Sequence, residues 1–108
     1  MHPKGQKAEK PEQLHYSLIL FVVNEGTNSR RARNNLERLC EQWLPRRHTI
    51  RVVDVLKDYQ TALDHNILLT PSVVIMSPEP RKIIHGDLSD ESKFTELLNF
   101  KGENEDDR

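Results

Sequence analysis

The sequence contains a single cysteine, Cys40, so no disulfide bond can form within the chain. Scarcity of cysteine is typical of proteins in reducing compartments, and we expect a cytoplasmic protein. No apolar run approaches the roughly 20 residues that a membrane-spanning helix needs, so no membrane association is expected. Residues 1–13 also lack the apolar core of a secretory signal peptide.

Other sequence features that carry chemistry are missing as well. The four glycines are dispersed, so no glycine-rich phosphate loop is present. The five histidines lack the spacing of metal ligands, and no serine lies in a nucleophile-elbow pattern. We therefore predict no metal site, no cofactor and no catalytic residue.

Charge is balanced overall but uneven along the chain. A net charge of −1 argues against a general nucleic-acid binder. Arginines nevertheless crowd the first half: Arg30, Arg31, Arg33, Arg38, Arg46, Arg47 and Arg51. A nucleic-acid contact through this basic segment therefore stays open as a minor alternative.

A chain of 108 residues with 35% apolar and 31% charged residues fits one domain with a small core. Residues 1–13 are polar, and we expect a disordered arm there. Residues 14–100 form the predicted domain. Residues 101–108 are mostly acidic and are predicted to be a disordered tail.

Residues 14–23 predict a first strand whose consecutive apolar positions are typical of a strand covered on both faces. Thr27 or Asn28 can cap the following helix, and Pro45 ends it. One apolar stripe at helical spacing marks that helix: Ala32, Leu36, Leu39, Cys40, Trp43 and Leu44. The β-branched residues 49–55 then predict a second buried strand.

The second half of the chain also alternates between predicted helices and strands, which are shorter than those of the first half. Asp58 can cap a short helix, and residues 72–76 form a third predicted strand. A proline-rich reversal leads to a fourth strand at residues 82–85, antiparallel to the third. Ser89 can cap a closing helix with one apolar face: Phe94, Leu97 and Leu98.

The resulting order is β-α-β-α-β-β-α, with parallel strands joined by helices before an antiparallel hairpin. This order predicts an α/β fold of the thioredoxin-like kind, in which a cis-proline commonly opens the third strand, where Pro71 lies. A thiol or peroxide enzyme with this fold needs a low-pKa cysteine at the start of the first helix. Residues 25–28 contain no sulfur, and Cys40 lies on the apolar stripe. We therefore favour a protein that is not an enzyme, with the thiol or peroxide enzyme as the alternative.

Three blocks of sequence carry a family resemblance. They are V-D-V-L-K at residues 53–57, T-P at residues 70–71 and I-x-G-D-L-S at residues 84–89. With the apolar residues 18–23, they closely resemble the KaiB family over about residues 16–95. This family comprises small circadian-clock proteins of cyanobacteria and relatives in other bacteria.

The resemblance implies a regulatory protein that binds a KaiC-like hexameric ATPase and forms a homo-oligomer, a dimer or a tetramer. It places partner contacts at Arg31, Gln60 and Lys82. Two positions lose a charge relative to the family pattern, because Asn66 replaces a lysine and Ile83 replaces an arginine. The first loop, residues 24–29, also lacks the family's usual Thr-Pro step. These losses of charge weaken the case for the standard contact with the ATPase, and the role stays open between a clock and a divergent stress-response system.

The resemblance also implies a second fold. KaiB-like proteins adopt a ground state in which the C-terminal half is rearranged to the order β-α-β-β-α-α-β. Pro71, Gly86 and Asp87 lie in that half, and we expect them to be structural positions for such a change of fold.

Overall fold

The computed structural model describes residues 14–24 and 26–98. The elements are β1 (Tyr16–Val22), α2 (Thr27–Trp43), β2 (His48–Asp54), α3 (Tyr59–Asp64), β3 (Ser72–Ser77), β4 (Lys82–His85) and α4 (Glu91–Leu97). This order confirms the thioredoxin-like prediction, and the alternative order is not the one adopted. The predicted N-terminal arm and acidic tail lie outside the described residues. In the described part of the chain, every helix is too short or too polar to span a bilayer.

The strands form one four-stranded sheet in the order β2-β1-β3-β4. β1 runs parallel to β2, whereas β3 is antiparallel to both of its neighbours. The expectation of parallel strands joined by helices therefore holds for β1 and β2 and is wrong for β3. A six-residue helix such as α3 spans only about 9 Å, too short to return the chain along a seven-residue strand of about 23 Å. β3 consequently begins at the end of the sheet where β2 stops.

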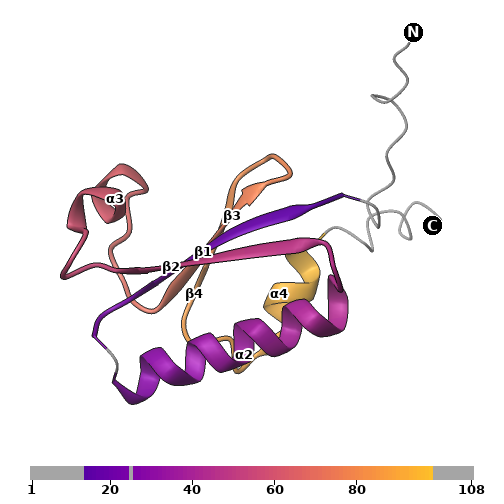
Figure 1. The fold of residues 1–108 in the computed structure, drawn as a ribbon, viewed down its shortest axis with the longest axis horizontal. Helices are drawn as coiled ribbons and strands as arrows, with labels where there is room; N and C mark the ends of the chain where they lie inside the picture. The colour runs from indigo at the N-terminus through magenta and orange to yellow at the C-terminus, as the bar shows by residue number, and fades with distance from the viewer. Residues whose placement is uncertain (1–13, 25, 99–108) are drawn as a thin grey trace, which may run out of the picture.

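The central strand β1 separates two unequal apolar layers (Figure 1). Leu18 and Leu20 belong to the larger layer, on the face covered by α2 and α4. Ile19 and Phe21 belong to the smaller layer, on the face that carries α3. This arrangement confirms that the first strand is covered on both faces.

The prediction of a second buried strand is wrong, because β2 lies at an edge of the sheet. Val53 is its one buried side chain, and Val52 is 39% exposed. The β-branched run indicated a strand but not its place in the sheet. The apolar stripe of α2 is confirmed by burial, except that Trp43 at the helix end is 36% exposed.

Two helix starts differ from the sequence prediction. Gly26 is the N-cap residue of α2, and neither Thr27 nor Asn28 caps it, since no side chain bonds the free N–H groups there. α4 is capped by Asp90, whose Oδ1 accepts from the Ser92 backbone N–H at 3.2 Å. Ser89 does not cap α4, because its hydroxyl group is bound elsewhere.

Candidate functional site

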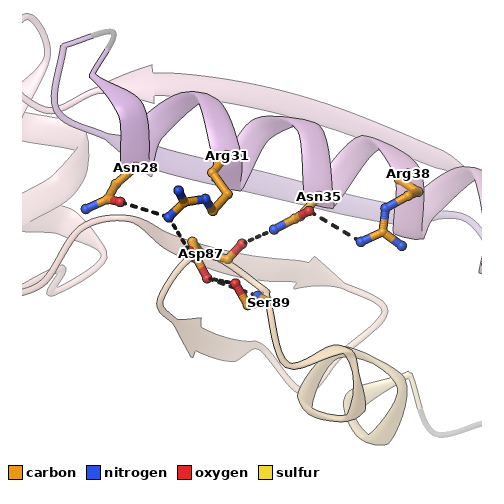
Figure 2. Close-up of polar contacts among 6 residues, drawn as sticks. All are labelled: Asn28, Arg31, Asn35, Arg38, Asp87 and Ser89. Carbon is orange, nitrogen blue, oxygen red and sulfur yellow. Dashed lines mark hydrogen bonds and ion pairs between the residues drawn. The ribbon is translucent and has the colours of Figure 1, made fainter.

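A tight turn after β4 holds a cluster of polar side chains that contact α2 (Figure 2). We call residues 86–89 the Asp87 turn. Gly86 has a φ of +103°, which favours glycine because it has no Cβ. Asp87 Oδ1 accepts hydrogen bonds from the Ser89 hydroxyl at 2.6 Å and from the Ser89 backbone N–H at 3.0 Å. These bonds, and then the nearby Arg31 guanidinium, lower the pKa of Asp87.

The Asp87 turn is tied to α2 by two side chains one helical turn apart. Arg31 Nη1 lies 3.4 Å from Asp87 Oδ2 and also donates to Asn28 Oδ1. Asn35 Nδ2 donates to the Asp87 backbone carbonyl at 2.8 Å. Figure 2 shows these contacts converging on Asp87 from one face of α2. Gly86 and Asp87, predicted as structural positions, therefore shape the turn that contacts the helix.

Arg38 lies on the same face of α2 and links this helix to α4. Its guanidinium donates to Glu91 Oε2 at 2.9 Å and to Asn35 Oδ1 at 3.3 Å. The sequence analysis did not single out Asn35 or Glu91. The spacing of Arg31, Asn35 and Arg38, at i, i+4 and i+7, was the available signal, because such residues share one helix face.

The three predicted partner contacts do not come together. Lys82, on β4, donates from Nζ to the Leu97 backbone carbonyl at 3.1 Å, at the C-terminal end of α4. Gln60 lies on α3, exposed, and donates to Asp64 Oδ1 at 2.9 Å. Arg31 lies on α2 with its side chain 50% exposed. Each therefore belongs to a different element and has a partner within the chain.

Large apolar side chains are exposed on α3 and its flanking loops, which we call the α3 surface. They are 57% to 88% exposed: Leu56, Tyr59, Leu63, Leu68 and Leu69. Gln60 lies on the same segment, and α3 stands apart from the larger layer in Figure 1. Exposed apolar groups gathered in this way mark interaction surfaces on soluble proteins.

Both losses of charge relative to the family pattern have a local structural reason. Asn66 has a φ of +58°, a left-handed conformation that asparagine tolerates better than lysine does. Ile83 is partly buried and packs against the smaller apolar layer. An arginine there would bring a charge against Phe21 and its neighbours.

The N-terminal end of α2 is where a thiol enzyme with this fold would carry its reactive cysteine. A cavity of about 330 Å³ lies between the helix start and Pro71, which follows a cis peptide bond. No thiol lines this cavity. The one cysteine, Cys40, is fully buried, and burial raises the pKa of its thiol to about 12. Within the described residues, no cluster of three or more His, Cys, Asp or Glu side chains could hold a metal ion.

These features define a protein with a thioredoxin-like fold and no thiol at the helix mouth. The thioredoxin Deadhead of Drosophila melanogaster superposes with a TM-score of 0.63 at 15% identity, over 81% of each chain. The N-terminal domain of SasA from Synechococcus elongatus superposes with a TM-score of 0.61 at 15% identity, over 95% of each chain. At these identities the likeness shows the fold alone.

Sequence comparison gives the family. The profile of the KaiB domain matches residues 19–100, so the chain belongs to the KaiB family. The circadian clock oscillator protein KaiB of Prochlorococcus marinus subsp. pastoris is 40% identical over 78 residues, covering 72% of this chain and 73% of that protein. KaiB1 of Synechocystis is 39% identical over 83 residues, covering 77% and 79%.

Proposed function

We propose that this protein is a non-enzymatic regulator that binds a KaiC-like hexameric ATPase through the α3 surface. The relatives at about 40% identity are clock oscillator proteins, which supports a regulatory role. The burial of Cys40 argues against a thiol enzyme, since a nucleophilic thiol needs a lowered pKa. The observation that carries the proposal is the exposure of Tyr59 and Leu63 on α3, the helix that also carries Gln60.

The α3 surface has the composition of an interface centre. It offers an aromatic ring and several leucines, and burying such groups provides most of the free energy of association. Gln60 supplies an amide at the same place, and its bond to Asp64 is exposed and can be exchanged for a bond to a partner. We therefore place Gln60 at the centre of the proposed contact.

Arg31 and Lys82 are proposed as outer contacts. The Arg31 guanidinium is half exposed and has more donors than its contacts with Asn28 and Asp87 use. Lys82 is bound to Leu97 through one of its three ammonium hydrogens. Both side chains can therefore contact the ATPase while they keep their hydrogen bonds within this chain.

Capture of the protein by a cognate KaiC-like hexamer, with nucleotide present, tests the proposal. Tyr59→Ala and Leu63→Ala should each weaken binding about tenfold, as expected for exposed apolar anchors. Arg31→Glu and Lys82→Glu should weaken it as well. Trp43→Ala is the matched control, because Trp43 is a partly exposed apolar residue on α2, away from the α3 surface. Absence of wild-type binding after hours of incubation would refute the partner assignment.

The same capture experiment separates a clock role from a stress-response role. We propose the divergent role because Asn66 and Ile83 replace charged residues of the family pattern. Asn66→Lys should then increase binding to a clock-type hexamer. Equal binding of Asn66→Lys and the wild type would remove this reason for a divergent branch.

A further inference from the structure

Within residues 14–24 and 26–98, the outer edge of β4 has backbone groups that no neighbouring strand uses. β4 is the last strand in the order β2-β1-β3-β4, and β3 is its neighbour on the inner side. The Gly86 N–H donates to the Pro71 carbonyl at 2.8 Å, which fixes the alternation of the antiparallel ladder. Ile84 therefore bonds to β3, while Ile83 and His85 direct their N–H and C=O groups outward. These groups can pair with one more strand.

A groove lies beside this edge, between β4 and α4. Its volume is about 300 Å³, and it is lined by Ile83, Ile84, His85, Lys93, Glu96 and Leu97. Ile84 belongs to the larger apolar layer and Leu97 packs against it, so the floor of the groove continues the core. A strand added to β4 would therefore gain apolar burial against Ile84 and Leu97 as well as backbone hydrogen bonds.

The pleat of an added strand determines which of its side chains enter the groove. Directly opposed residues of paired strands share a face, so the residue opposite Ile84 points toward α4. The residues opposite Ile83 and His85 point to the other face. The residue opposite Gly86 again faces α4. An antiparallel strand passes Gly86 before Ile84, so these two groove-facing residues are two positions apart, with the one opposite Gly86 first.

Lys93 determines the charge preferred opposite Gly86. It lines the groove and also a neighbouring cavity of about 180 Å³ formed with residues 84–90, so it lies at the Gly86 end of β4. Lys93 is exposed, and it takes no part in the ion pairs of the described residues. Asp90 lines the same cavity, but its carboxylate caps α4 and accepts from the Ser92 hydroxyl at 2.6 Å. An incoming carboxylate can therefore pair with the Lys93 ammonium.

The other end of the groove has charges of both signs. Lys82 donates to the Leu97 carbonyl at 3.1 Å, so the start of β4 lies beside the end of α4. Glu96 precedes Leu97 and lies at this same end. Because a cation and an anion lie together here, this end favours an uncharged side chain.

We propose that the β4 edge binds an extended segment of another protein, antiparallel to β4, in which an acidic residue comes two positions before a large aliphatic one. The aliphatic side chain fills the groove beside Ile84, and the carboxylate pairs with Lys93. The residue between them exchanges backbone hydrogen bonds with His85, and the residue after the aliphatic one does so with Ile83. This site goes beyond the proposed ATPase contact, because it lies on β4 and α4 and not on the α3 surface.

The probe is the synthetic peptide acetyl-Thr-Glu-Val-Leu-Val-Thr-Thr-amide. In the proposed register its glutamate and leucine face α4, and its valines pair with His85 and Ile83. Fluorescence anisotropy of the labelled peptide with the full chain should show saturable binding. N-methylation of either valine should weaken binding about tenfold, because each change removes one hydrogen bond to β4. N-methylation of the leucine is the matched control and should have little effect, since that N–H points away from β4.

A reversal of charge tests the role of Lys93. Lys93→Glu should weaken binding of the glutamate peptide about fivefold, because it replaces an attraction by a repulsion. The same variant should bind the peptide with lysine in place of glutamate more tightly than the wild type does. Lys57→Glu is the matched control, since it makes the same change of charge in an exposed turn and should leave both affinities unchanged.

Amide hydrogen exchange provides a local readout of strand addition. The N–H groups of Ile83 and His85 should gain protection when the peptide is added, whereas that of Ile84, already bonded to β3, should not change. Protection of Ile83 and His85 that rises with protein concentration without peptide would show a second copy on this edge and would overturn the proposal. Lack of saturable binding, equal losses from the three N-methylations, or binding unaffected by Lys93→Glu would overturn it as well. None of these measurements involves the proposed ATPase.

Discussion

The side-chain amide of Asn35 donates a 2.8 Å hydrogen bond to the backbone carbonyl of Asp87, which lies 52 residues further along the chain. This bond joins the middle of α2 to the turn between β4 and α4. It is part-buried, so its loss is not fully compensated by water. The contact therefore contributes to holding the last quarter of the chain against the first helix.

Asn35→Ala should lower the free energy of unfolding by about 1 kcal/mol, the usual value for one hydrogen bond of this kind. Urea unfolding followed by circular dichroism measures the change. Asn34→Ala is the matched control, because Asn34 is the exposed neighbour on the same helix. Equal losses in the two variants would mean that the bond to Asp87 contributes nothing.

Gly86→Ala should destabilise the fold by about 1–3 kcal/mol, since its φ of +103° is strained for any residue with a Cβ. The added methyl group meets no atom within 4 Å, so the cost comes from the backbone alone. Gly26→Ala is a control of the same kind, with equally open space but a φ of −71°. Thermal unfolding of the two variants should therefore separate them, and a stable Gly86→Ala protein would contradict the strained turn.

The lowered pKa of Asp87 predicts a stability that depends on pH in the acid range. The pKa of Asp87 is lower in the folded protein than in the unfolded chain, so the charged carboxylate stabilises the fold at pH values above the unfolded-state pKa. This contribution is lost as the pH falls through the folded-state pKa. Asp87→Asn should be less stable than the wild type near neutral pH, and the two should converge below the folded-state pKa. Parallel unfolding curves across this range would contradict the assigned contacts with Ser89 and Arg31.

The raised pKa of Cys40, about 12, predicts an unreactive thiol. At pH 8 the native protein should be alkylated about a thousandfold more slowly than the unfolded chain, from the difference in thiolate fraction alone. The neutral thiol is favoured in the folded state, so stability should also decline as the pH rises above about 9, where the unfolded thiol ionises. Fast alkylation without unfolding would refute the burial of Cys40.

The sequence predicted those parts of the fold that depend on neighbours in the chain. The helical spacing of Leu36, Leu39 and Cys40 identified a buried stripe, and all three are fully buried. The consecutive apolar positions of β1 identified the central strand. Element order followed from these local patterns, and with it the fold class.

Sequence patterns did not predict the features that depend on contacts between segments distant in the chain. The burial of β2 depends on its place in the sheet, and its β-branched residues contain no information about that place. The contact of Arg31 with Asp87 spans 56 residues, and the pairing of Asn35 with the same turn was not visible either. Ser89 was assigned to the α4 cap because serine suits that role, but its hydroxyl group bonds Asp87 and leaves Asp90 as the cap.

The two apolar layers on either side of β1 differ in size. The free energy needed to separate each layer from the sheet should therefore differ as well. Phe21 and Val74 anchor a small cluster under the short helix α3, whereas the layer beneath α2 and α4 contains many more buried side chains. Separating α3 from the sheet exposes less apolar surface than global unfolding does, so it requires less free energy. Within the described residues, we therefore expect α3 and its loops to open more readily than the layer beneath α2 and α4, which can stay folded meanwhile.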